Sequence, residues 1–350
     1  MMKNGNGNMT ATLRDVAKLA GVSVSTASFS LNGGDKVKEE TRRRIAWAAE
    51  ELNYIPNASA RSLVTQKNLV IGVVRCVDKL DDRFYAFDTT IDTYLSEMLK
   101  SIEQESIRLG YSLMVEWSST YGQSDGVPRL YKSGKVDGVL MVGGIVPREF
   151  PEKIKKLNVP TVMVGSRNDL FDWVDTDYTQ AMREAVAYLV SLGHKDIAFI
   201  NGPGNSQTSA LKLEGFRQGL GQAGLPFDEK HVGAGDFSGL TGYEAMARFW
   251  ENGFHPTALV AAVDCIAIGA LRFLHERNVY CPDGISIVGF EDGLLAEYSV
   301  PPLTTFSSEK QLLGIDACHL LIQRIQHPEQ PLEQKLIEPR LIVRMSTKTV

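Results

Sequence analysis

Residues that could carry out catalysis are present, but they are not arranged for it. His194, in the stretch LGHK, is the best candidate for a general base, yet no nucleophile or second base accompanies it. The motifs GxSxG and HExxH are absent, and GPGNSQ (202–207) makes a poor phosphate-binding loop. The four cysteines are scattered without zinc-ligand spacing, at Cys76, Cys265, Cys281 and Cys318. We therefore expect no enzyme activity, no metal site and no cofactor, and a structural role for His194.

A different chemistry is offered by the stretch TLRDVAKLAGVSVSTASFSLNG (12–33). Two short apolar-periodic segments flank the break at Gly21-Val22-Ser23, and their inner faces consist of Val16, Ala17, Leu19, Ala20, Val22, Ala27 and Leu31. The second segment turns small or uncharged side chains outward: Val24, Ser25, Thr26, Ser28 and Phe29. Such a helix can approach the major groove of DNA closely, as in a helix-turn-helix. An ordinary helical hairpin docked on the rest of the chain fits this pattern equally well.

The elements that position this stretch have recognisable start and stop signals. Thr12 is expected to cap the first helix together with Asp15, and Ser23 to cap the second. A third helix is predicted from about residue 39 to 53, with Ile45, Ala49 and Leu52 on its apolar face and Pro56 ending it. A short helical stretch then leads to the body of the chain.

The distribution of charge distinguishes this head from the body. The whole chain carries −5, but residues 1–63 hold nine lysines and arginines against six acids, including the run Arg42-Arg43-Arg44. A small basic head on an acidic body is typical of a nucleic-acid-binding domain attached to another function. With 43% hydrophobic and 23% charged residues, the chain is ordinarily globular, and no apolar run is long enough for a membrane span. We expect a cytoplasmic protein that does not contact membranes.

The body alternates apolar strands with helices. The predicted strands are 69–74, 111–117, 138–143, 161–165, 196–202, 258–263 and 285–290, with later strand-like segments at 303–306 and 340–344. Amphipathic helices are predicted at 94–109, 178–192, 208–223, 239–252 and 266–277. Continuous apolar strands separated by helices predict parallel sheets covered on both faces. The fold class is therefore α/β: a helix-turn-helix domain followed by two doubly wound parallel-sheet lobes.

These elements predict five regions. Residues 1–10 form a disordered tail, 11–56 the DNA-binding headpiece and 57–66 a hinge helix or linker. Residues 67–166 and 302–330 form the N-terminal lobe of an effector domain, and 167–301 with 331–350 form its C-terminal lobe. A ligand is expected in the cleft between the lobes, at the carboxyl ends of the strands.

Several stretches resemble the LacI/GalR family of bacterial transcriptional regulators. The stretch 12–33 is similar to its DNA-binding signature, and YIPNASARSL (54–63) to its hinge helix. The likeness continues, in the family's order, through SLGHKDIAFINGP, PTALVAAVDCIAIGALRFL, GISIVGFEDGLLAEYSVPPLTTF and RLIVRMST. The resemblance implies that the two lobes are of the periplasmic-binding-protein type. It also implies a homodimer bound to a pseudo-palindromic operator and switched by a small effector.

The resemblance also assigns DNA contacts. Val24, Ser25 and Phe29 fall at positions where the family reads bases; Phe29 replaces a common Arg or His and would touch a thymine methyl or the backbone, unless it packs inward. Phosphate contacts are expected from Thr12, Ser23, Thr26, Ser28 and Asn32. In the hinge, Leu63 matches the side chain that wedges into the minor groove, and Asn57, Ala60 and Arg61 accompany it. Without the resemblance, this hinge segment reads as a solvated linker.

For the effector site, the resemblance selects Asp264, which follows a strand, and Lys212, where an Arg is usual. The remaining expected contacts are Phe84, Tyr85, Arg167, Ser206, Thr208 and Phe237. Two alternatives stay open: Asp264 as a helix N-cap, and Arg167 in an interlobe salt bridge with an acid such as Asp177. The resemblance therefore implies a DNA-binding regulator that senses a carbohydrate, and we expect it to act as a repressor. The rival interpretations are a solute-binding protein without DNA binding and an α/β sugar-processing enzyme.

Overall fold

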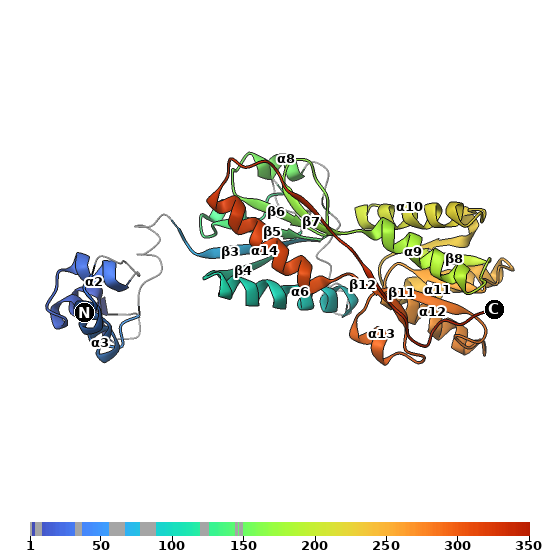
Figure 1. Cartoon of the computed structure of the whole chain (residues 1–350), viewed down its shortest axis with the longest axis horizontal. Coiled ribbons are helices and arrows are strands. Elements are labelled where there is room, and N and C mark those ends of the chain that lie inside the picture. The colour runs from blue at the N-terminus through green and yellow to red at the C-terminus, as the bar shows by residue number, and fades with distance from the viewer. Residues whose placement is uncertain are drawn as a thin grey trace. The chain divides into compact units, whose positions relative to one another are not determined.

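The computed structural model describes residues 2–3, 9–31, 37–55, 67–77, 89–119, 126–143, 146 and 150–350. The chain divides into two compact units, Met1–Leu69 and Val70–Val350, which correspond to the predicted head and body (Figure 1). We describe each unit by itself.

The described part of the head forms three helices, as predicted. Its helices are α1 (Leu13–Leu19), α2 (Val24–Leu31) and α3 (Glu39–Glu51). Its small core consists of Val16, Ala17, Ala20, Ala27, Ile45 and Ala48. Leu19 was expected on the inner face, but its side chain is 42% exposed, because Val16, Ala17 and Ala20 already fill this side of such a short helix. Ala48 takes part in the contact although the pattern of α3 did not single it out.

Both predicted N-caps are confirmed. The Thr12 side chain accepts from the amide of Asp15, and the Asp15 carboxylate accepts from the Thr12 amide at 2.9 Å, so the capping box is complete. The Ser23 hydroxyl accepts from the Thr26 amide at 3.1 Å at the start of α2. Before α1, Met2–Lys3 (β1) and Met9–Thr10 (β2) pair as short antiparallel strands, within the stretch expected to be a disordered tail.

The body contains two six-stranded sheets. The first has the order β13-β7-β6-β5-β3-β4, and all its neighbours are parallel. Its strands are β3 (Val70–Val77), β4 (Ser112–Ser119), β5 (Gly138–Val142), β6 (Thr161–Val164), β7 (Asp172–Thr176) and β13 (Gln334–Ile337). Its helices are α6 (Thr89–Arg108), α7 (Arg129–Ser133), α8 (Phe150–Lys155) and α14 (Lys310–Gln326).

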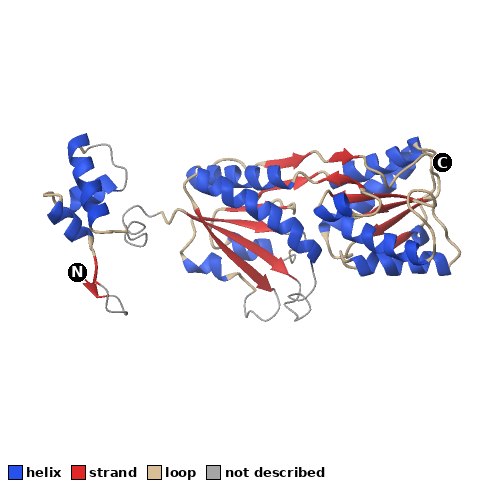
Figure 2. Cartoon of the chain, turned by 90° about the horizontal axis from the view of Figure 1, so that it is seen from below, coloured by secondary structure: helices blue, strands red, loops and turns tan. Residues whose placement is uncertain are grey.

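The second sheet has the order β14-β12-β11-β10-β8-β9, and only the β12–β14 pair is antiparallel. Its strands are β8 (Ile197–Asn201), β9 (Val232–Ala234), β10 (Ala258–Ala261), β11 (Ser286–Glu291), β12 (Thr304–Ser307) and β14 (Arg340–Ile342). Its helices are α9 (Tyr178–Ser191), α10 (Gln207–Gln222), α11 (Gly239–Glu251), α12 (Asp264–Glu276) and α13 (Leu294–Tyr298), with a short 3-10 turn at Glu229–His231. The predicted fold class is confirmed, and both lobes are visible in Figure 2.

The chain crosses between the lobes later than predicted at all three crossings. The first sheet still includes β7, so the first crossing follows Thr176 rather than residue 166. The second sheet includes β12, so the next crossing follows Ser307 rather than residue 301. Strand β13 pairs with β7 in the first lobe, so the chain returns only after Ile337. Strands β7 (DWVDT) and β13 (QKLI) contain polar residues, so a search for apolar runs does not find them.

The interiors of both lobes are apolar on both faces of their sheets. Every residue of β5, β6, β8 and β10 is buried. In the second lobe α9 packs on α10 and α11 packs on α12, while in the first lobe α14 packs on α6 and on three strands. Within the described residues, no helix is both long and apolar enough to cross a membrane.

Candidate functional site

The outward face of α2 carries uncharged side chains, as predicted. Phe29 is 44% exposed and Val24 is 42% exposed, and Ser25 beside Val24 is also exposed. The inward-packing alternative for Phe29 is therefore wrong: Ala27 and Ser30 occupy the buried side of the helix. Thr26 and Ser28 are half-buried at the edges of this face. The helix can therefore present apolar and hydroxyl groups, without a charge, to a surface that it enters.

Charge is supplied to the head from α3. Arg43 and Arg44 are exposed, and Arg43 pairs with Glu39 one turn earlier at 3.2 Å. Thr12 is half-buried, and its hydroxyl is engaged with Asp15 at 2.7 Å. Several predicted contacts lie outside the described residues: Asn32 after α2, the hinge residues Asn57, Ala60, Arg61 and Leu63, and Phe84 and Tyr85 in the body.

Asp264 lies at the start of α12, buried, with only 3% of its surface exposed. It does not cap the helix, because the N-cap residue is Val263 and no side chain caps this end. Instead its carboxylate accepts from the Gly293 amide at 3.0 Å and from the Thr305 hydroxyl at 2.6 Å. Burial raises the pKa of Asp264 to about 7, although both donors favour the charged form.

Lys212, the predicted clamp, is buried inside the second lobe. Its side chain is 2% exposed, and its Nζ donates to the Ala262 carbonyl at 2.5 Å. The ammonium lies 4.0 Å from the ring centroid of Phe290 and 5.1 Å from that of Tyr178. Burial lowers the pKa of Lys212, while Glu291, Asp264 and Asp175 oppose this shift. Lys212 therefore places a compact positive charge behind the site.

Glu291, at the end of β11, is a site residue that the sequence analysis missed. It is half-buried, and the described residues give its carboxylate no hydrogen-bond partner. Burial and the neighbouring Asp264 raise its pKa, and Lys212 and Lys310 oppose this. An acid at the carboxyl end of an apolar strand was the signal used to select Asp264, and GFED carries the same signal. Glu291 therefore offers an acceptor that the described residues leave unoccupied.

Arg167 forms a salt bridge, but with a different acid from the one anticipated. Its Nε lies 2.8 Å from Asp175 Oδ2 on β7, in its own lobe, whereas Asp177 caps α9. The contact between the lobes is made by its main chain: its amide donates to Gln207 Oε1 at 2.6 Å, and Gln207 Nε2 donates to its carbonyl at 3.2 Å. The guanidinium also lies over the Trp173 ring.

Two tyrosines and an acid form a further link between the lobes, which the sequence analysis did not predict. Tyr94 on α6 lies close to Tyr178 at the start of α9, and Tyr178 lies close to Asp175, so that these groups shift one another's pKa. Burial raises the pKa of both tyrosines and raises that of Asp175 to about 6. Asp175 therefore contacts both Arg167 and the second lobe.

The remaining predicted contacts lie around the end of β8. Ser206 is buried and caps α10 by accepting from the Ser209 amide at 3.4 Å, so its hydroxyl serves the helix. Thr208 and Phe237 are half-buried. The Phe237 ring packs directly on Gly202, where a Cβ would overlap it. Phe237 is thus held beside this strand end, as an aromatic wall for a ligand requires.

His194 is structural, as predicted. It is buried, and its ring nitrogens lie 3.1 Å from the Thr257 hydroxyl, 2.9 Å from the Ser286 hydroxyl and 3.1 Å from the Lys348 carbonyl. Burial lowers the pKa of His194, which favours the neutral ring. These contacts attach the C-terminal segment to the second lobe. Within the described ranges no group of three or more His, Cys, Asp or Glu is placed to bind a metal.

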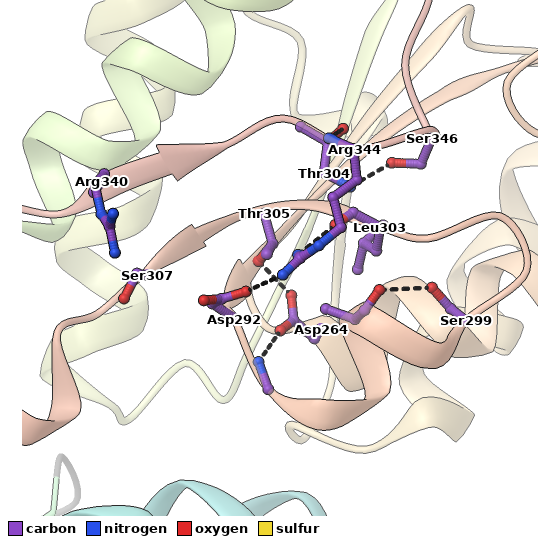
Figure 3. A network of polar contacts seen from close by, with 12 residues as sticks. Asp264, Asp292, Ser299, Leu303, Thr304, Thr305, Ser307, Arg340, Arg344 and Ser346 are labelled. Atoms are coloured by element: carbon purple, nitrogen blue, oxygen red, sulfur yellow. Dashed lines mark hydrogen bonds and ion pairs between the residues drawn. The ribbon is translucent and has the colours of Figure 1, made fainter.

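The polar groups at the lobe junction are mostly engaged with one another. Lys310 pairs with Glu97 at 2.7 Å. Arg344 pairs with Asp292 at 2.6 Å, as Figure 3 shows. The Arg167–Asp175 pair completes this set. Among the described residues, this arrangement contains acceptors and fixed charges but no nucleophile paired with a base, so it is suited to binding rather than to bond cleavage.

Comparison with known proteins supplies independent information about both units. Residues 12–57 match the family "Bacterial regulatory proteins, lacI family", and residues 186–347 match "Periplasmic binding protein-like domain". The chain is 31% identical to the HTH-type transcriptional repressor PurR of Histophilus somni (strain 2336), over 97% of this chain and 100% of that protein. It is also 31% identical to the HTH-type transcriptional regulator DegA of Bacillus subtilis (strain 168), over 97% and 98%.

Solved structures agree with these matches. The lac repressor dimer bound to operator and the anti-inducer ONPF is 26% identical, with a TM-score of 0.83, covering 97% of this chain and 100% of that one. The complex of the transcriptional regulator CelR with cellobiose is 28% identical, with a TM-score of 0.71, covering 96% and 99%.

Proposed function

The chain belongs to the lacI family of bacterial transcriptional regulators. From this premise we propose that it is a homodimeric repressor that binds a pseudo-palindromic operator. A carbohydrate bound between its lobes either releases the repressor from the operator or enables it to bind there. It is a DNA-binding regulator with an effector domain and not an enzyme. We further propose that the protein acts in the cytoplasm.

DNA reading is assigned to the exposed face of α2. One α2 helix from each protomer enters the major groove of a half-site, with Val24, Ser25 and Phe29 toward base edges. Phe29 can contact a thymine methyl but cannot donate a hydrogen bond to a purine, so an A·T pair is expected beneath it. The flanking hydroxyls and the arginines of α3 supply phosphate contacts.

A dimer is supported by the apolar surface of the body. Leu294, Leu295, Tyr298 and Val300, on α13 and just after it, are 43–91% exposed. In the first lobe, Ile107 on α6 and Val115 and Trp117 on the edge strand β4 are also exposed. Figure 1 shows α6, β4 and α13 on one side of the body. Monomeric proteins rarely expose large apolar patches to water. We therefore assign this side of the body to the interface with a second copy of the chain.

The effector proposal rests on the carboxylate of Glu291, which accepts no hydrogen bond from the described residues and interacts electrostatically with Lys212 and Asp264. Sugar hydroxyls donate hydrogen bonds to such acids, and the half-buried Phe237 offers an apolar wall for a sugar ring. A relative was solved with cellobiose and another with ribose. A purine is the second candidate, because relatives named PurR are among those with 31% identity and because ring N–H groups can also donate to Glu291.

Selection of binding sites from a random duplex pool with the full-length protein tests the DNA half of the proposal. Enrichment of a palindrome with a flexible central step is the expected result. Failure to enrich any sequence, with cellobiose, ribose, hypoxanthine and guanine each added in turn, would contradict the proposed operator binding. Thermal unfolding of the protein with the same four compounds tests the effector half of the proposal. If only a purine raises the melting temperature, a purine replaces the carbohydrate as the proposed effector.

A further inference from the structure

The segment from Glu291 to Gly293 has an unusual backbone. Glu291 and Asp292 both adopt positive φ, +118° and +53°, although neither is glycine. Consecutive left-handed residues with side chains are strained, and they persist only where surrounding contacts hold them. The segment is a three-residue turn that joins the end of β11 to the start of α13.

Two anchors hold this turn (Figure 3). On one side, the Gly293 amide donates to Asp264 Oδ2 at 3.0 Å, and Asp264 is itself held by the Thr305 hydroxyl. On the other side, Asp292 Oδ1 accepts from Arg344 Nη2 at 2.6 Å. Glu291 is the member of the turn whose carboxylate makes no hydrogen bond to the described residues.

Arg344 is fixed in turn by the strand next to it. Its Nη1 donates to the Leu303 carbonyl at 2.9 Å, and its amide donates to the Thr304 hydroxyl at 3.0 Å. Both Arg344 and Asp292 are largely covered, with side chains 20% and 24% exposed. A charge-assisted pair in a partly buried setting holds its geometry better than an exposed one. The C-terminal segment therefore clamps the turn to β12.

From these contacts we propose that Arg344, Asp292 and Asp264 are positioning residues, which hold the strained turn so that the Glu291 carboxylate faces the effector. The inference rests on the proposed function, in which Glu291 accepts from the effector. Asp264, expected from the sequence as a direct ligand, acts in this account through the Gly293 amide. The turn also begins α13, so the same clamp connects the effector contact with the apolar surface assigned to the second copy.

The test compares Arg344→Gln with Arg344→Lys in the full-length protein. Arg340→Gln is the matched control, because Arg340 is on β14 nearby but pairs with Glu309 at 3.4 Å and is 71% exposed. Hydrogen exchange of the peptide covering 286–300 is measured first, because it needs no ligand. Faster exchange in Arg344→Gln, partial recovery in Arg344→Lys and no change in Arg340→Gln are expected.

Binding of cellobiose, ribose, hypoxanthine and guanine is then measured by calorimetry. If the clamp keeps Glu291 in its competent geometry, and its loss leaves about a tenth of the molecules competent, Arg344→Gln weakens binding about tenfold. Arg344→Lys should recover part of this loss, because it keeps the charge but not the fork. A merely structural role would instead lower the melting temperature and leave the affinity of the folded protein unchanged.

The two proposals fail in different ways. If none of the four compounds binds the wild-type protein, the proposed effector classes are wrong, and the exchange measurement still decides whether Arg344 holds the turn. If a compound binds the wild type and Arg344→Gln equally well, or if exchange of 286–300 is unaltered in Arg344→Gln, the positioning role is wrong.

Discussion

At the scale of single residues, burial decides how the acids at the lobe junction behave. Asp264 is nearly inaccessible, and the loss of water around its carboxylate outweighs the two donors that it has. Lys212 is buried nearby and is stabilised by a carbonyl and two ring faces instead of a direct carboxylate contact. Small changes of pH, or the binding of a ligand, can therefore change the protonation of these buried groups.

This setting predicts a pH dependence of stability. The folded-state pKa of Asp264 is raised from 3.8 to about 7, so its contribution to the free energy of unfolding is fully present below about pH 4 and is lost as pH rises through 7. Asp264→Asn should remove this loss, which amounts to at most about 4 kcal/mol. Thermal unfolding at pH 5 and pH 8 measures it: the variant should lose less stability between them than the wild type. Equal losses would show that Asp264 ionises normally in the folded protein.

At the scale of elements, α1 and α3 leave one face of α2 exposed, and this is the face that we propose to read DNA. Phe29→Ala should weaken binding to the selected operator about tenfold, the effect of one good base contact, without changing the slope of affinity against salt. Trp47→Ala is the matched control, since this aromatic is 54% exposed on α3 of the same head. Fluorescence anisotropy at several salt concentrations measures both. Equal losses in the two variants would remove Phe29 from the base-reading surface.

The helix pair α11–α12, which carries Asp264, depends on glycines at its contact. A Cβ on Gly269 would overlap the carbonyl of Gly239, and one on Gly242 would overlap that of Ile266. Gly269→Ala should therefore lower the free energy of unfolding by about 1–3 kcal/mol, because the helices must separate. Gly221→Ala, in α10 with open space around it, should raise it by roughly 0.5–1 kcal/mol. Denaturant titration of both variants measures the contrast, and destabilisation of equal size would contradict the close approach of α11 and α12.

At the scale of the whole molecule, the two lobes are joined by three crossings and by side chains that bridge them. Arg167 with Gln207, and Tyr94 with Tyr178, connect elements of different lobes next to the proposed effector site. A ligand that touches both lobes can therefore shift their arrangement only through its differential affinity for the two arrangements.

The proposed dimer is tested at the same scale. Leu294→Lys, on α13, should place a charge in the interface and convert the dimer to monomers, with a loss of operator affinity of at least tenfold. Leu157→Lys is the control, because Leu157 is 38% exposed and follows α8, away from α13 in Figure 1. Sedimentation velocity of both variants checks the outcome. A monomeric wild-type protein, or a dimer unaffected by Leu294→Lys, would contradict this assignment.

Features that depend on neighbouring residues could be predicted without the structure. The capping box of Thr12 and Asp15 needs residues three apart, and the uncharged face of α2 follows from helical periodicity. Buried parallel strands such as ALVA in β10 are apolar throughout, so they are recognised from their composition. The sequence therefore determined the head, the alternation of strands and helices and, through its resemblance to known regulators, the class of function.

Features that depend on residues far apart in the chain were decided by the tertiary structure alone. The edge strand β13 contains polar residues and is defined by its pairing with β7, in which Ile337 lies opposite Thr176, 161 positions earlier in the chain. The last crossing was therefore misplaced. Arg167 met Asp175 rather than Asp177, and Asp264 met Gly293 and Thr305 rather than its own helix. The physical reason is common to all of these: a side chain's partner is set by which strands, helices and turns pack beside one another within a lobe, and local periodicity contains no information about that packing.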